Sequence, residues 1–111
     1  MKDATLGRAG VTEAACINTP SIRQVDPPAT VVRQGFNVQP DGQSAISVTG
    51  ANFRQGATIV ANDAPLPTVF GSDHWLTAFF DEALYSRRGT VEIRVRNPDR
   101  CTSPAAVFTV K

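Results

Sequence analysis

One stretch constrains the fold more than any other: residues 46–53, which read ISVTGANF. Apolar and polar residues alternate there, the alternation stops at Gly50, and a second β-rich run resumes after Gly56. Alternation puts successive side chains on opposite faces of a strand, so that one face is buried and the other meets water. Two such runs joined by a glycine-containing turn are typical of paired core strands.

The length and composition of the chain indicate one globular domain. Its 111 residues are enough for one core and too few for two well-packed ones. No apolar run approaches the roughly 18 residues that a membrane-spanning helix needs, so we expect no membrane span. Residues 1–10 hold no continuous apolar run of the length that an export signal requires. We expect an N-terminal extension or linker at 1–19, a domain at 20–111, and a larger parent protein.

Runs with β character recur about every ten residues with turn signals between them, which is the spacing of a β-sandwich. The first run should lie at a sheet edge, because Pro27 and Pro28 follow it and proline cannot donate to a sheet ladder. One helical turn is expected at 81–85. The predicted strands span 21–25, 30–33, 44–50, 57–62, 66–70, 74–80, 90–97 and 105–110.

The alternation also predicts which side chains form the core. The cleanest case is 90–97, where Val91, Ile93 and Val95 point inward and the charged residues between them face water. Phe53 should close the core over the turn that follows 46–50. The predicted core comprises Ile46, Val48, Phe53, Ile59, Leu76, Ala78, Val91, Ile93, Val95 and Phe108.

No catalytic site is evident in the residue pattern. His74 is the only histidine, and Ser72, Asp73 and His74 are consecutive, so we expect their side chains to diverge and not to hydrogen-bond as a catalytic triad. The adjacent carboxylates Asp81 and Glu82 favour a capping or solvated-turn role over an acid–base pair across a cleft. The sequence therefore predicts a protein that is not an enzyme.

Cofactor, metal and nucleic-acid sites are likewise not predicted. Cys16, His74 and Cys101 lack the close spacing of a zinc site, and the glycines are scattered at turns rather than gathered into a phosphate-binding loop. The formal net charge is only +1. Arg94 and Arg96 should share an outer strand face with Glu92 between them, which favours ordinary solubilising charges over nucleic-acid binding.

Residues 20–110 resemble a known domain family. The chain resembles the immunoglobulin-like IPT/TIG domains of plexins, Rel-type transcription factors and many bacterial surface proteins. The resemblance implies an all-β, immunoglobulin-like, two-sheet antiparallel β-sandwich of the early-set, IPT/TIG type. The sequence departs from the family pattern at Asp81, where proline is usual, and at 99–101, where a glycine-rich turn is frequent. The matching residues, in family order, are 46–53, 56–58, 76–78, Leu84, 89–90, 95–98, Ser103 and 108–110.

The resemblance also bears on the two cysteines. In an immunoglobulin-like topology the chain enters its first strand at the end where the last two strands are joined. Cys16 precedes that first strand and Cys101 lies in that last loop, so a disulfide would need no rearrangement of the sandwich. Such a bond would suit an oxidising compartment, whereas the alternative is two free thiols in a cytosolic domain.

The alternation of the strand at 74–80, together with the resemblance, predicts a docking surface. If Leu76, Ala78 and Phe80 face the core, then Trp75, Thr77 and Phe79 project from the outer face. The two aromatics would lie about 13 Å apart along the strand and form one apolar strip, which in proteins is more often covered than bare. Either an external neighbour or the N-terminal residues 6–15 could cover it.

Three functions of different classes remain open, because a sandwich fold does not fix a function. The leading hypothesis is a non-catalytic interaction or spacer module of a larger, bacterial cell-surface or secreted protein. The alternatives are a carbohydrate-binding accessory domain and a transcription-factor-like dimerisation domain. The expected partners are neighbouring domains, another protein or a polysaccharide.

Overall fold

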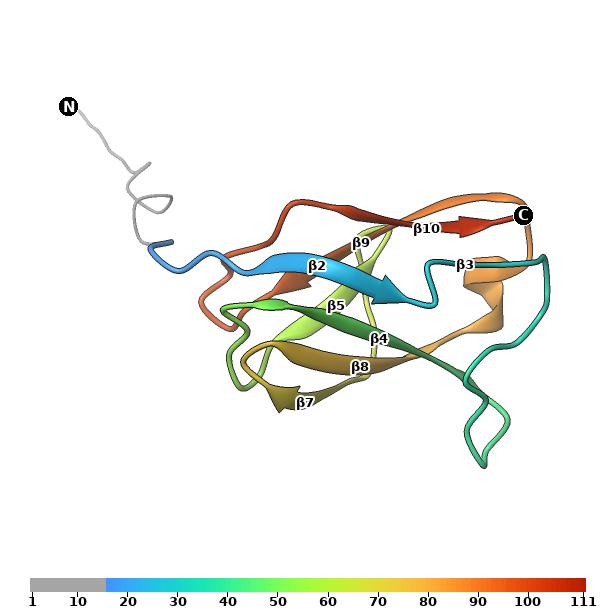
Figure 1. The fold of residues 1–111 in the computed structure, drawn as a ribbon, viewed down its shortest axis with the longest axis horizontal. Coiled ribbons are helices and arrows are strands. Elements are labelled where there is room, and N and C mark those ends of the chain that lie inside the picture. The colour runs from blue at the N-terminus through green and yellow to red at the C-terminus, as the bar shows by residue number, and fades with distance from the viewer. Residues whose placement is uncertain (1–15) are drawn as a thin grey trace.

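A computed structural model describes residues 16–111, which form two β-sheets packed face to face (Figure 1). The first sheet has the strand order β2-β4-β8-β7, and all of its neighbouring strands are antiparallel. Its strands are β2 (Ser21–Asp26), β4 (Ser44–Ala51), β8 (Trp75–Phe80) and β7 (Thr68–Ser72).

The second sheet has the order β3-β10-β9-β5-β6. It is antiparallel except where the short strand β3 runs parallel to β10. A single 3₁₀ turn, η1 (Glu82–Tyr85), joins β8 to β9, as the sequence predicts. The strands are β3 (Ala29–Thr30), β10 (Ala106–Val110), β9 (Gly89–Arg96), β5 (Thr58–Ala61) and β6 (Ala64–Pro65).

The core lies between the two sheets and contains every residue that the alternation assigns to it. On β9, Val91, Ile93 and Val95 are all 3% exposed or less, and Phe53 covers the core at the turn after β4. Four aromatic rings meet at the other end, where Phe36, Phe80 and Phe108 have ring centroids 4.9–5.6 Å apart and Tyr85 packs beside Phe36. The predicted fold class, an immunoglobulin-like β-sandwich, is confirmed.

The chain changes sheets at its two consecutive prolines, which corrects one predicted strand. A strand was predicted at 30–33, whereas β3 covers only Ala29–Thr30 and lies beside β10 in the sheet opposite β2. The peptide bond between Asp26 and Pro27 is cis. Because proline has no N–H for the ladder with β4, the chain leaves that sheet. The Pro28 carbonyl then accepts a hydrogen bond from the Thr109 N–H at 3.0 Å.

Two further boundaries differ from prediction around β7. The expected strand at 66–70 is shifted, since Leu66 is buried outside any strand and β7 begins at Thr68. The strand predicted at 74–80 begins one residue later, at Trp75, because Asp73 and His74 form the turn that precedes it. The Thr68 side chain explains part of the shift: its hydroxyl accepts from the Ile59 N–H and donates to the Leu66 carbonyl, which fixes the chain entering β7.

A disulfide joins Cys16 to Cys101 across 85 residues of sequence, as the topology predicts. It ties the segment before β2 to the loop between β9 and β10. The Cys101 side of the bond is buried. No described cysteine is free, and a disulfide indicates an oxidising environment.

Burial of Ile93 makes a direct test of the sheet register. Ile93→Ala should lower the free energy of unfolding by about 2 to 5 kcal/mol, because the side chain is fully enclosed and its removal leaves a cavity. Val107→Ala is the matched control, since Val107 is 54% exposed on the neighbouring strand. Denaturant titration should show a control loss below roughly 0.5 kcal/mol. A loss that small for Ile93→Ala would contradict the register.

The disulfide should contribute a large share of the stability. Replacing both Cys16 and Cys101 by serine should lower the free energy of unfolding by up to roughly 4 to 5 kcal/mol, because the long loop is no longer closed in the unfolded chain. Urea titration of the parent with and without a reducing agent, beside the double variant, measures this loss. Identical midpoints in all three samples would show that the bond does not form in solution.

Candidate docking face

The outer face of the first sheet carries the residues predicted to project from it. Trp75, Thr77 and Phe79 alternate with Leu76, Ala78 and Phe80, which are buried at 3% exposure or less. Trp75 is 45% exposed, whereas Thr77 and Phe79 are half-buried. The register therefore places all three where the sequence predicts. We call Trp75, Thr77 and Phe79 the aromatic strip.

The indole of Trp75 lies across the sheet between two neighbouring strands. At one end its Nε1–H donates a hydrogen bond of 2.7 Å to Ser47 Oγ on β4. At the other end its six-membered ring lies over Gly71 on the edge strand β7. A Cβ atom at Gly71 would overlap Trp75 Cε3 and would approach Cζ3 and Cδ2 to 2.9 and 3.0 Å. The ring is thus positioned from both sides, and we call it the indole platform.

Phe79 lies at the other end of the strip beside two shallow hollows. One, of about 200 Å³, is lined by Ala45, Pro67, Val69 and the strip residues Thr77 and Phe79, among others. The second, of about 430 Å³, lies between Phe79, the β6–β7 connection and the 3₁₀ turn. Val69 pairs with Thr77 on the same face and is 62% exposed. The strip therefore runs from a flat ring at Trp75 to a hollowed surface at Phe79.

The paired outward positions of this sheet carry almost no charge. They hold no Lys or Arg, and Asp26 on β2 is the only acidic residue among them. The arginine nearest in the sheet, Arg23, lies at the bulge of β2, two strands away from β8. The paired outward residues are Ser21, Gln24 and Asp26 on β2; Ala45, Ser47, Thr49 and Ala51 on β4; Trp75, Thr77 and Phe79 on β8; and Val69 and Ser72 on β7, where Gly71 lies unpaired at a register shift.

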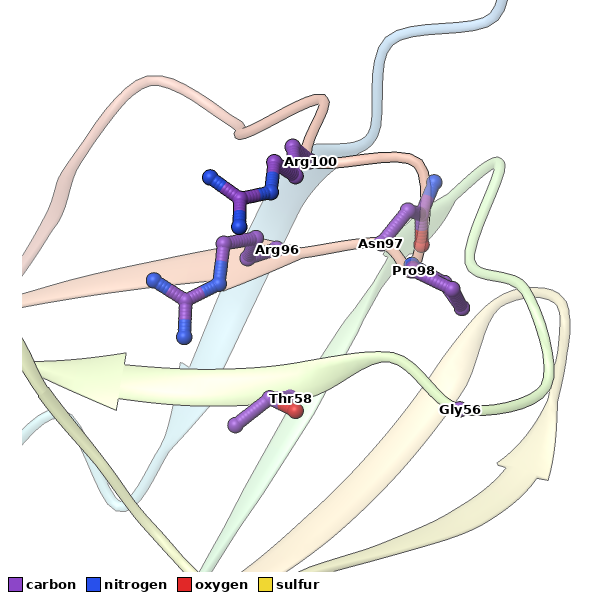
Figure 2. Close-up of a pocket in the computed structure, with 6 residues that line it drawn as sticks. All are labelled: Gly56, Thr58, Arg96, Asn97, Pro98 and Arg100. Atoms are coloured by element: carbon purple, nitrogen blue, oxygen red, sulfur yellow. The ribbon is translucent and has the colours of Figure 1, made fainter.

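The charges gather on the second sheet, whose outer face holds a different kind of hollow. Figure 2 shows Arg96 and Arg100 with their guanidinium groups pointing to the same side, above Thr58. Together with Gly56, Asn97 and Pro98 they line a space of about 490 Å³. Farther along β9, Arg94 pairs with Glu92 at 3.2 Å, as the sequence suggests. This hollow can attract anions, but both of its arginines are exposed surface side chains.

Asn97, at the edge of that hollow, has a structural role that the sequence pattern did not reveal. It is 2% exposed; its Oδ1 accepts from the Arg54 N–H at 3.1 Å and its Nδ2 donates to the Asn52 carbonyl at 2.9 Å. The sequence predicts only the end of a strand at this position. The buried amide instead joins the turn after β4 to the loop that carries the disulfide.

The side chains of Ser72, Asp73 and His74 do not diverge as expected, although they do not form a catalytic triad. Because Asp73 and His74 form a tight turn after Ser72, the last residue of β7, His74 Nδ1 lies 2.9 Å from Asp73 Oδ1 and 3.2 Å from Ser72 Oγ. Both contacts converge on one ring nitrogen. A catalytic triad needs the acid on one nitrogen and the nucleophile on the other, so this exposed cluster has the geometry of a turn.

Residues 16–111 contain neither a cluster of metal ligands nor a helix that could span a membrane. No three His, Cys, Asp or Glu side chains in this range are grouped closely enough to hold a metal ion. Within the same range, no helix has the length and apolar character needed to cross a membrane. The predicted alternative that residues 6–15 cover the aromatic strip lies outside the described residues.

Sequence reasoning found the strip residues and the cysteines but missed the two partners of Trp75. Ser47 was assigned only to the solvent side of β4, and Gly71 only to a turn. Neither role has a sequence signal of its own, because the Ser47 contact spans 28 residues and the Gly71 contact follows from the orientation of one ring. A glycine inside a strand next to an aromatic is the one hint available, since glycine there often marks a close approach.

The chain is similar to a known protein in structure but matches none in sequence. No family model matches the chain. No curated protein matches it in sequence. The crystal structure of a gamma-CGTase from Alkalophilic bacillus clarkii superposes with a TM-score of 0.62 at 22% identity. The shared fold is an immunoglobulin-like β-sandwich. The match covers 83% of this chain and only 12% of the CGTase, and at this identity it shows the fold alone.

The exposure of the strip predicts that it can be removed without loss of the fold. The double variant Trp75→Ala with Phe79→Ser should remain folded and lose only a few degrees in melting temperature, because the opposite face of β8 supplies the core. Thermal melts followed by circular dichroism measure this, with Val107→Ala as the control for an exposed position. A double variant that does not fold would place these aromatics in the core.

Proposed function

We propose that this chain is a non-catalytic interaction module of the IPT/TIG type within a larger secreted or cell-surface protein. The aromatic strip is its docking face. The assignment to the IPT/TIG family is supported by the matching motifs at 46–53 and 95–98 and by the immunoglobulin-like fold. The family assignment is more specific than the fold, because proteins with many unrelated functions share this fold.

The single observation that carries this proposal is the placement of Trp75. An indole that is 45% exposed, hydrogen-bonded at its nitrogen and seated on a glycine does not contribute to the core. Tryptophan is among the residues that dominate binding contacts, because it offers a large rigid surface. A ring positioned in advance also loses little conformational freedom on binding, which favours recognition.

The disulfide and the course of the chain support a secreted module within a larger protein. Disulfides persist in oxidising compartments and are rare in the cytosol and nucleus. The bond between Cys16 and Cys101 therefore favours a secreted module over a transcription-factor-like dimerisation domain. The first described residues and Lys111 lie at opposite ends of the sandwich (Figure 1), an arrangement suited to a module joined to others in series.

Site-specific photo-crosslinking tests the docking face. Val69 and Val107 are matched positions, because both are exposed valines on strands, at 62% and 54%, on opposite sheets. Benzoylphenylalanine at position 69 of the parent protein in its natural host should yield adducts with a neighbouring domain, another protein or a glycan. The same group at position 107 should not. Adducts of equal yield at both positions, or at 107 alone, would contradict the proposed face.

A further inference from the structure

The surface that Trp75 leaves open is the face of its ring. Its only hydrogen-bond donor, Nε1–H, is already satisfied by Ser47, and the side toward β7 is occupied by Gly71. A partner cannot bind through the indole nitrogen without breaking the contact with Ser47. What remains for recognition is one flat, electron-rich face of an aromatic ring.

The same outer face carries hydroxyl and amide side chains on β8 and on the two strands beyond it. Thr49 pairs with Trp75 on β4, Thr77 follows it on β8, and Gln24 pairs with Thr49 on β2. The Thr49 hydroxyl donates to the Gln24 carbonyl at 3.4 Å, whereas within residues 16–111 the side chains of Thr77 and Gln24 make no hydrogen bond to another residue. A ligand stacked on the ring would therefore meet neutral donors and acceptors at its edges, the kind of group that fixes orientation in a binding site.

The lack of basic residues argues against anionic partners. Nucleic acids and anionic membranes are bound largely through Lys and Arg. The paired outward positions of this sheet have none; Arg23, exposed at the β2 bulge, is the only basic residue on its four strands, and Asp26 on the same strand offsets its charge. Arg96 lies on β9 of the other sheet and Arg100 in the loop between β9 and β10, so they cannot serve a ligand stacked on Trp75.

The apolar surface is also narrow for a stable protein interface. Standard interfaces bury about 800 Å² on each partner around an apolar core. Here Trp75 and Val69 are the exposed large apolar residues on the paired outward positions, Phe79 is half-buried, and Thr77 separates the two aromatics. A ligand that needs one ring face and several hydroxyl contacts fits this composition better than a second copy of the chain.

We infer that the indole platform binds a neutral oligosaccharide. A sugar ring has a face of C–H groups with slight positive character, which packs on the electron-rich indole, and hydroxyls at its rim. The rim hydroxyls would reach Thr77, Thr49 and Gln24, and further sugar units would follow β8 toward Phe79. This inference rests on the proposed function, since it names the occupant of the same docking face.

The chain's single tryptophan makes a titration specific to this site. The probes are neutral hexasaccharides with glucose, N-acetylglucosamine, mannose or xylose backbones, and an oligogalacturonide as the acidic comparison. At least one neutral probe should change the Trp75 emission in a saturable way at millimolar concentration or below. The oligogalacturonide should give no saturable change.

The Gly71→Ala variant tests whether binding needs the indole in its observed orientation or only the presence of a tryptophan. The added methyl displaces the ring while the residue and its fluorescence remain, because the atoms that it meets belong to the Trp75 side chain and not to the backbone. Affinity for the binding hexasaccharide should fall about tenfold or more, as expected when an aromatic stack is lost. Val107→Ala on the opposite sheet is the control and should bind as the parent does.

The titration and the crosslinking experiment together distinguish failure of the oligosaccharide inference from failure of the proposed docking face. Failure of all neutral hexasaccharides to bind, or equal binding by the parent and Gly71→Ala, would overturn the oligosaccharide inference. If crosslinks from position 69 then map to a protein, the docking face stands and its occupant is a polypeptide. If position 69 gives no adduct either, the docking face itself is wrong. Saturable binding of the oligogalacturonide alone would contradict the charge argument.

Discussion

The two-sided environment of β8 is the constraint on which the rest of the structure depends. This strand lies between β4 and β7, and its residues Leu76, Ala78 and Phe80 are enclosed by the opposite sheet. A shift of one residue would exchange its two faces and move this buried set into water. The interior therefore fixes the register, and the register alone puts Trp75 outside.

The exterior of β8 is then shaped by its two neighbours. A bare indole would rotate among several rotamers, but β4 offers the Ser47 hydroxyl at one side and β7 offers a position without a side chain at the other. Each neighbour contributes little alone. Together they convert an exposed aromatic into an oriented surface, which distinguishes a binding feature from the scattered apolar residues that any protein exposes. The charged outer face of the second sheet carries no comparable ring.

Sequence reasoning succeeds where a pattern has a period and fails where a contact depends on three-dimensional detail. Alternation identified the buried face of β9 and the outward position of Trp75, and topology joined Cys16 to Cys101. It could not show that the chain changes sheets after Asp26, that His74 turns back onto Asp73, or that Asn97 bridges two loops. Those features depend on backbone turns and on side-chain contacts between residues far apart in sequence.

Nuclear magnetic resonance of the chain's one indole tests the central claim most directly, because the platform exists only if the ring is held between Gly71 and Ser47 in solution. A ring held in this way should give nuclear Overhauser contacts from the Hε3 and Hζ3 protons of Trp75 to the Hα protons of Gly71, and slowed solvent exchange of the indole N–H. An indole N–H that exchanges as in free tryptophan, with no contacts to Gly71, would contradict it.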